Sequence, residues 1–527
     1  MTSRTIESLF ERYGPVYKWY ATSSVMLGCI ATVLSSTMFN VAMPDIMGEF
    51  GMGQDQVQWL STAFLAAMTT CMLITGWALA AYGSLTAYMA ALIAFSAGSL
   101  IGGTANSAEI LILGRVLQGG AAGLIQPLTM VIILTVFDPS KRGLAMGIHT
   151  LGIVVAPALG PTLGGILVDN YSWRFICFIG IPLCLAGSVL VLIFLPRQDK
   201  RNADVGSFDL LGFLLLSLAV GSLLSGISNG QRLGWDSSFV RGSFVVSAYS
   251  WAAFLVREKT CKTPLLPLDV YANPRFVAAA VVSFILGMGL FGSTYLVPLF
   301  VELVQGYAPT EAGLMLLPAG LALGILAPLS GEMADRLPPN LLIILGLAIV
   351  AWSSVLLAGV DSSTDFWVLS GWVLLSRVGL AFISPALNSG AVRVLPPEQM
   401  GYGAGNINFM RQFGGALGIG VLSVYLEQQT TLYCQSFNAM QTGNHIAADT
   451  LVQISRMLMQ AGIYDTLTWA LHPDAAYYFL SEMIAAKGQM MGFRESFFLT
   501  AVVCAAGIIP AWFVRARRKQ DSGQPGE

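Results

Sequence analysis

The sequence is a succession of apolar segments, each long enough to cross a lipid bilayer. A spanning helix needs about 20 mostly apolar residues, and fourteen such segments alternate with short polar stretches. They lie near residues 22–44, 59–80, 86–106, 109–137, 143–168, 174–195, 208–228, 239–256, 276–301, 312–330, 340–360, 366–392, 403–426 and 497–514. The chain is therefore predicted to be an all-α polytopic membrane protein with fourteen transmembrane helices.

Composition excludes several other classes of protein. Only 11% of the residues are charged, against roughly 25% in soluble domains, and the net charge of −2 lacks the basic excess of a nucleic-acid binder. The seven cysteines form no CxxC pair, and there are three histidines. No P-loop, HExxH helix or nucleophile elbow with triad partners occurs. We expect neither an enzyme nor a metal, cofactor or nucleotide site.

Basic residues predict the orientation, because cytoplasmic loops carry an excess of Lys and Arg. Placing both termini and alternate loops in the cytoplasm collects eighteen Lys or Arg residues there and leaves six on the other side. Nothing at the N-terminus resembles a cleavable signal peptide, since the first apolar segment is long enough to span. The prediction is a multi-pass protein of the bacterial inner membrane with both termini cytoplasmic.

Three arginines, Arg115, Arg377 and Arg411, remain inside apolar segments. A charge at the bilayer centre costs about 2.5–3.5 kcal/mol on insertion scales, so such residues are expected to face a wet cavity or a partner group. A purely structural role as a hydrogen-bond hub is the alternative for Arg115. Arg377 follows Arg115 by 262 positions, and each is followed eleven residues later by an amide.

A second correspondence, between Gly76 and Gly331, has an offset of 255 positions. Similar offsets indicate two related six-helix halves. We expect an N-terminal half in residues 1–200, an inserted helix pair with linkers in 201–262 and a C-terminal half in 263–527. Residues 427–490 are expected to form a long outer loop, with amphipathic helices on or just outside the membrane that either pack at the interface or dock a partner.

The fifth apolar segment carries a dense run of small residues and prolines, including Gly147, Gly160, Pro161, Gly164 and Gly165. Small residues let two helices approach closely, and proline removes a backbone donor and permits bending. The run predicts a tight, bendable seam between the halves. A plain close helix crossing is the alternative.

Three further motifs accompany this run. The fourth segment contains R-x-x-Q-G, with Arg115 and Gln118, and a turn after the tenth segment contains G-x-x-x-D-R, with Gly331, Asp335 and Arg336. The first segment ends in L-S-x-T-x-x-N-V-A-x-P. With the fifth segment, these motifs resemble the fourteen-helix drug:proton antiporter branch of the major facilitators, the EmrB/QacA type.

The resemblance implies a major facilitator fold and roles for these residues. Arg115, Gln118 and Arg377 would serve transport or coupling. Asp335 and Arg336 would form a cytoplasmic charge lock that opens as the halves rock. Ala80 and Ala81 replace the corresponding charged pair of the N-terminal half, so only one such lock is expected.

Proton coupling needs a group that changes charge, and Ser35 stands where this branch usually places Asp. The remaining candidates are Glu302, near the outer end of its segment, and His149 in the fifth segment. A solvated interfacial carboxylate and a packed histidine are the respective alternatives. Asp209 and Glu495 are expected to be solvated helix caps.

Two functions follow from these observations. The first is a secondary exporter of amphipathic or hydrophobic compounds, probed by dye accumulation and by a protonophore. The second is a dedicated transporter of one polar or anionic solute, with Arg115, Arg377 and Arg411 as anion contacts. Besides lipid, substrates and protons, the resemblance implies a periplasmic adaptor and an outer-membrane channel if the cell is Gram-negative.

Overall fold

The computed structural model describes residues 6–39, 41–196, 207–261, 263–442 and 475–514, together with 453, 456, 457 and 460. Within these residues the chain is helical and contains no strand. The α-helices are α1 (Ile6–Tyr13), α2 (Tyr17–Met38), α3 (Met43–Phe50), α4 (Gln54–Cys71), α5 (Thr75–Gly103), α6 (Ala108–Val136), α7 (Arg142–Asn170), α8 (Arg174–Phe178), α9 (Gly180–Phe194), α10 (Leu210–Leu233), α11 (Ser238–Thr260), α12 (Pro274–Leu303), α13 (Pro309–Arg336), α14 (Pro339–Ala358), α15 (Phe366–Arg393), α16 (Met400–Thr442), α19 (Ala475–Ala506) and α20 (Ile508–Phe513). Short 3-10 helices are η1 (Gly14–Val16), η2 (Met72–Ile74), η3 (Pro139–Lys141), η4 (Leu268–Ala272) and η5 (Pro397–Gln399).

Twelve stretches of the described chain are helices long and apolar enough to cross a membrane. One of them, Trp59–Gly103, has 45 residues, about twice the length that a single span needs, and it is interrupted at Gly83, where φ is +73°. The 29 residues of α7 are long enough to span as well, although several of its side chains lie outside the described set. The predicted all-helical membrane fold is confirmed, and the helices are consistent with fourteen spans.

Local sequence sets the start of several long helices. The side chains of Ser107, Asp209, Asn273 and Asp365 accept hydrogen bonds from first-turn N–H groups of α6, α10, α12 and α15. These caps pair backbone donors that the helix itself leaves unpaired. Asp209 is thus a helix cap as expected, but its side chain is buried and pairs with Arg257 at 3.1 Å.

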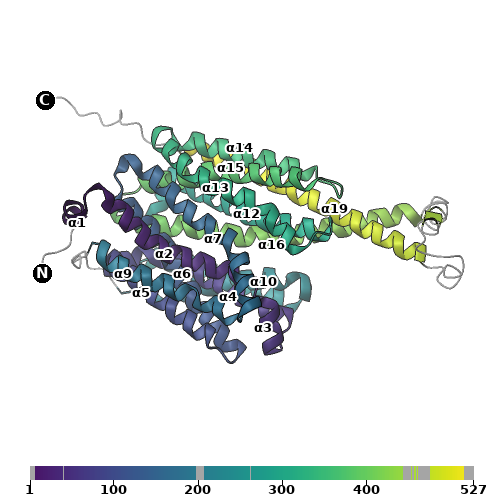
Figure 1. The fold of residues 1–527 in the computed structure, drawn as a ribbon, viewed down its shortest axis with the longest axis horizontal. Coiled ribbons are helices and arrows are strands. Elements are labelled where there is room, and N and C mark those ends of the chain that lie inside the picture. Colours follow the sequence, from purple (N-terminus) through teal and green to yellow (C-terminus); the bar gives the residue numbers. More distant parts are fainter. Residues whose placement is uncertain are drawn as a thin grey trace.

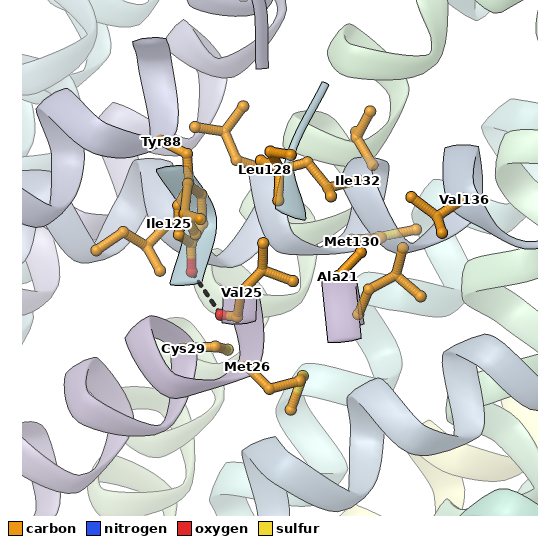
Figure 2. Packing of buried hydrophobic residues seen from close by; sticks show 14 of the residues in the cluster. Ala21, Val25, Met26, Cys29, Tyr88, Ile125, Leu128, Met130, Ile132 and Val136 are labelled. Carbon is orange, nitrogen blue, oxygen red and sulfur yellow. Dashed lines mark hydrogen bonds between the residues drawn. The ribbon is translucent and has the colours of Figure 1, made fainter. Parts of the chain in front are cut away.

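The helices gather into two bundles (Figure 1). The N-terminal bundle contains α2, α4, α5, α6 and α9, and the C-terminal bundle contains α12 to α16 and α19, while α7 packs on both α2 and α13. Figure 2 shows part of the N-terminal core, where the Tyr88 hydroxyl donates a hydrogen bond of 2.5 Å to the Val25 carbonyl. The domain boundaries given above stay a prediction.

Helices α10 and α11, the inserted pair, pack on each other, and α10 also lies against α4 and α16. The Ser247 hydroxyl of α11 donates to the Ala219 carbonyl of α10 at 2.8 Å. One buried cluster joins Phe64 of α4, Val220 of α10 and Phe409 of α16. The inserted pair therefore covers the side of the molecule where the two bundles meet along α4 and α16.

Helices α16 and α19 extend well beyond the other helices (Figure 1). Residues 427–442 and 475–490 fall in the segment expected to lie as a loop on the membrane, but they continue α16 and α19. The extensions pack on each other through Gly488, which lies against Cys434, while the Tyr433 hydroxyl donates to Glu495 at 3.0 Å. Most of residues 443–474 lie outside the described residues.

Both ends of the described chain lie at the same end of the bundles. Trp19, near the start of α2, packs on Phe137, which shortly precedes α7. Val514, the last residue described, lies beside Gly390 near the end of α15. We call this the inner end, and we call the opposite end, from which α16 and α19 protrude, the outer end.

Candidate functional site

One carboxylate holds the two bundles together at the inner end. Asp335 of α13 accepts hydrogen bonds from the backbone N–H groups of Gly143 and Leu144 at 2.7 and 2.9 Å. Arg393, the last residue of α15, donates to the same carboxylate at 2.7 Å. The two amides belong to the first turn of α7, where the helix dipole favours a negative charge. Asp335 thus bridges the two bundles, and its role as a charge lock stays a prediction.

Arg336, predicted to complete this lock, has a different partner. It pairs with Glu332 one turn earlier on the exposed side of α13, and 76% of its side chain is exposed. Neighbouring helix positions point about 100° apart, so Asp335 and Arg336 do not face the same way. The arginine at the lock is Arg393, whose only sequence signal was a basic residue in the last turn of a helix.

Glycines bring the inner parts of α7 and α13 into backbone contact. A Cβ atom on Gly143 would meet the Gly331 carbonyl, and one on Gly331 would meet the Gly143 carbonyl. One turn further, a Cβ on Gly147 would meet the Ala327 carbonyl and lie 2.7 Å from the Cα of Pro328. Gly147 and Gly331 therefore lie at the seam between the bundles.

A second contact between the bundles joins η2 and α5 to α16 without charged groups. The ring of Tyr402 covers Gly76, and a Cβ on Gly401 would lie 3.2 Å from the Gly76 Cα. This contact forms close to Ala80 and Ala81, where the sequence lacks the expected charged pair. Here a tyrosine ring and two glycines pack closely where the two bundles meet.

The outer part of the small-residue run in α7 faces its own bundle. A Cβ on Gly160 would meet the Thr37 side chain, and one on Gly164 would lie 3.2 Å from the Met38 carbonyl, both on α2. Nothing lies within 4 Å of a Cβ on Gly165, and the side chain of Pro161 lies outside the described residues. The predicted seam between halves is thus formed by Gly147, whereas Gly160 and Gly164 pack within the N-terminal bundle.

Arg115 is buried at the middle of a hydrogen-bonded hub. Its guanidinium lies between the rings of Phe39 and Phe64, 4.2 and 4.1 Å from their centroids, a cation–π arrangement that favours a desolvated charge. It donates to Gln118 at 3.0 Å, and Gln118 donates to Ser99 at 2.8 Å. The two predicted residues are brought together, and the rings cover both faces of the arginine.

Arg377 lies at the corresponding place of the C-terminal bundle. It has fewer hydrogen-bond partners than Arg115. It donates to the hydroxyl of Thr294 on α12 at 2.8 Å, and its other terminal nitrogen, Nη1, is buried without a partner. Thr294 itself is exposed. The two related arginines therefore have different surroundings, and only Arg115 is enclosed by aromatic rings.

His149 lies on α7 with its side chain fully buried, and neither ring nitrogen makes a hydrogen bond of good geometry, although the backbone of Gln126 acts on the ring. The charge of Arg411 on α16 acts on it and on Cys29 of α2. Arg411 donates to Asn408 on the same helix. The charge of Arg411 on α16 thus acts across the seam on residues of α2 and α7.

Comparison with known proteins identifies the family. The family model "Major Facilitator Superfamily" matches residues 25–419. The chain belongs to this superfamily. It is 28% identical to the multidrug export protein EmrB of Haemophilus influenzae over 502 residues, 94% of this chain and 95% of that one. It is 27% identical to the multidrug transporter protein MdtP of Bacillus subtilis, over 77% of this chain and 75% of that one.

A solved structure shows the same fold. The human organic anion transporter MFSD10 superposes with a TM-score of 0.61 at 13% sequence identity, over 94% of this chain and 99% of that one. At that identity the likeness concerns the fold alone. The family model and the multidrug relatives above confirm the drug:proton antiporter branch of the superfamily that the motifs indicate, and this facilitator is a multi-pass membrane transporter.

Aromatic and methionine side chains of α4, η2 and α12 differ in how deeply they are buried in this facilitator. Phe64, Met68 and Met72 are buried in the cluster beneath the inserted pair, whereas Phe291 and Tyr295 are partly exposed. Glu302, the penultimate residue of α12, is partly exposed at the outer end, far along that helix from the inner charge lock.

A groove of about 300 Å³ lies between α10 and α16 towards the outer end of this facilitator. Its walls are almost wholly apolar and consist of Ile227, Trp235, Gly420, Val421, Val424, Tyr425 and Gln428. Gly420 allows close approach to Ile227, and Gly230 allows the Trp235 ring to fold over α10. The inserted pair therefore contributes an apolar recess beside the C-terminal bundle.

Proposed function

We propose that the protein exports amphipathic or hydrophobic compounds from the cytoplasm by proton antiport with alternating access. The observation that carries this proposal is the contact at the inner end, where Asp335 bridges the bundles and the outer ends of the same helices carry no such bridge among the described residues. The printed names of EmrB and MdtP, a multidrug export protein and a multidrug transporter, support export as the direction.

The inner contact is of a kind that can open. Hydrogen bonds to a charged group contribute about 1.5–3 kcal/mol each, and Asp335 accepts three of them from the opposite bundle and from Arg393. The glycine contacts beside it are flat, so the backbones can separate without interlocked side chains. Parting α7 from α13 would open the central region to the inner side, as rocking of two rigid bundles requires.

Proton coupling is proposed to use His149 or Glu302. His149 lies at the seam, where a rocking motion would change its access to water, and Glu302 lies near the outer end of α12. The side chain of Ser35 cannot titrate, although its hydroxyl is buried without a partner. The variants His149→Ala and Glu302→Gln separate the candidates, since the residue that carries the proton is required for protonophore-sensitive transport.

The inner end is proposed to face the cytoplasm of a bacterial inner membrane. The excess of basic residues in the loops and tails on this side supports the assignment. The outer end would then face the periplasm of a Gram-negative cell. The protruding parts of α16 and α19 would offer a surface for a periplasmic adaptor that leads to an outer-membrane channel, and co-purification with such an adaptor tests this.

Dye accumulation in cells tests the proposed export. Cells that contain the protein are expected to accumulate less ethidium or less of an uncoupler than cells without it, and a protonophore should abolish the difference. Asp335→Asn should abolish it as well, without loss of the protein from the membrane. If cells with and without the protein accumulate ethidium equally, and also accumulate the uncoupler equally, the export function is excluded.

A further inference from the structure

The centre of the molecule contains a group of polar residues that spans both bundles. Asn408 of α16 donates to the Met130 sulfur of α6 at 3.5 Å and to the Ala404 carbonyl at 2.9 Å, and its oxygen accepts from Arg411. Cys29 and Met130 belong to the buried N-terminal core (Figure 2). Asn408 has therefore used its hydrogen-bonding capacity, and it orients the guanidinium of Arg411 towards the N-terminal bundle.

Arg411 carries a charge that nothing nearby neutralises. In the part of the chain that the structure describes, the ion pairs join Arg174 to Glu49, Arg257 to Asp209, Arg336 to Glu332 and Arg393 to Asp335, all near helix ends. None of them includes Arg411. A charge in the membrane interior normally has a partner or faces a water-filled cavity, and Arg411 keeps partial exposure while Asn408, His149 and Cys29 around it are buried.

His149 supplies the second observation at this place. Its ring is completely buried, and neither nitrogen makes a hydrogen bond of good geometry, although the backbone of Gln126 and the charge of Arg411 both act on the ring. A buried polar atom without a partner is uncommon and calls for an explanation. A neutral imidazole offers one N–H donor, which, beside a guanidinium, would suit an anionic oxygen.

We propose that Arg411, positioned by Asn408, and His149 form a binding site between the bundles for the anionic group of an amphipathic substrate, a carboxylate or sulfonate on an apolar body. The inference rests on the proposed export function and names its substrate class. Arg115 is a poorer site for such a group because two rings cover its guanidinium. Arg411 instead lies where opposite bundles meet, so a ligand bound there contacts both.

A negatively charged substrate also fits the absence of a carboxylate from the first apolar segment. An anion that leaves a cell with a negative interior moves down the electrical gradient, and about 100 mV supports a concentration ratio of about fiftyfold for one charge. A cationic substrate would instead need a carboxylate to bind it, and Ser35 occupies the expected place. The arrangement of charges therefore fits an anion better than a cation.

A matched pair of fluorescent probes tests the site by direct binding. Anilinonaphthalene sulfonate and phenylnaphthylamine share an apolar body, and only the first carries a negative charge. Each is titrated against the full-length protein in lipid nanodiscs, with empty nanodiscs as the baseline. The wild-type protein is expected to bind the sulfonate more tightly than the neutral probe.

The variant Arg411→Gln should weaken sulfonate binding by about tenfold to a hundredfold and change binding of the neutral probe by less than about twofold. Arg411→Lys, which keeps the charge, should retain part of the preference for the sulfonate. Arg241→Gln is the matched control, because Arg241 is exposed at the start of α11, and it should bind both probes as the wild type does.

Equal affinity of the wild-type protein for both probes would overturn the proposal, and this result needs no variant that folds poorly. The proposal would also be overturned if Arg411→Gln lost affinity for both probes equally, or lost affinity for neither. Export is measured separately, as energy-dependent uptake of the two probes into everted vesicles. If neither probe is taken up while the preference for binding the sulfonate is intact, export alone is refuted, whereas uptake of the probes without that preference would refute the anion site alone.

Discussion

At the scale of the residue, the choice between Arg393 and Arg336 decides how the inner lock works. Arg393 shares the Asp335 carboxylate with two backbone amides, while Arg336 pairs with Glu332 on an exposed face. Exposed pairs of the second kind contribute little because water and salt screen them. Of the two ion pairs, only that of Arg393 lies on the carboxylate that joins the bundles, through the amides of Gly143 and Leu144.

We therefore expect Arg393→Gln to reduce export at least tenfold, corresponding to about 1.4 kcal/mol or more of lost lock stability. Arg336→Gln is the matched control and should leave export within about twofold of the wild type. Dye efflux at equal protein levels measures both. Similar defects in the two variants would show that the lock is not built as described.

Glu49 gives a second prediction at this scale. It accepts hydrogen bonds from Arg174 at 2.8 Å and from Trp173 at 2.6 Å, and these hydrogen bonds, first that of Arg174, hold the pKa of Glu49 below its ordinary value of 4.5. A carboxylate with a lowered pKa stabilises the fold above its ordinary value, and the contribution is lost as the pH falls through the lowered pKa.

The wild type should therefore become less stable to thermal unfolding in detergent as the pH falls below 4.5, and this loss of stability in acid should be smaller in Glu49→Gln. The expected difference is only a few tenths of a kcal/mol, because 40% of the Glu49 side chain is exposed and water screens the pair. Identical acid sensitivity of the two proteins would contradict the assignment.

At the scale of the element, α7 makes two kinds of helix contact along its length. Its inner part meets α13 across the seam through Gly143 and Gly147, and its outer part packs on α2 through Gly160 and Gly164. Contacts of the first kind must form and break in a transport cycle, whereas those of the second kind can persist. A single small-residue run therefore combines a moving surface with a fixed one.

Gly147→Leu should keep the inner seam from closing, since its side chain would occupy the place of the Ala327 carbonyl and Pro328. Overpacking of this kind costs about 1–3 kcal/mol, and we expect loss of export with normal membrane insertion. Gly165→Ala is the control, because nothing lies within 4 Å of a Cβ there. Accessibility of a cysteine placed at Ser35 to an impermeant thiol reagent added from the cytoplasmic side would report the open seam.

At the scale of the whole molecule, two bundles meet at a centre that contains buried arginines, and no ion pair neutralises them within the described residues. The membrane potential acts on any charge that crosses this centre, by about 2.3 kcal/mol per charge per 100 mV. For an anionic substrate, the potential and the proton gradient would both favour export.

Valinomycin with potassium, which collapses the potential, should therefore slow sulfonate transport in everted vesicles more than transport of the neutral probe. Nigericin, which collapses the pH gradient, should slow both to a similar extent if protons are exchanged. Equal sensitivity of the two probes to valinomycin would argue against transport of the charged form.

The sequence by itself determined the membrane fold and the superfamily. These depend on segment length, apolar composition and short motifs, all of which are local. It did not determine that α16 and α19 continue as protruding helices, because their packing joins residues about 50 positions apart, such as Cys434 and Gly488.

Only the tertiary structure decided which side chains face one another. Arg393 meets Asp335 from 58 positions away, and Arg411 approaches His149 from the opposite bundle. No spacing along the chain encodes such pairs, because they arise from how whole helices pack, within the C-terminal bundle for the first pair and across the seam for the second. The same reason separates Arg115, enclosed by two aromatic rings, from Arg411, which lacks any neutralising partner among the described residues.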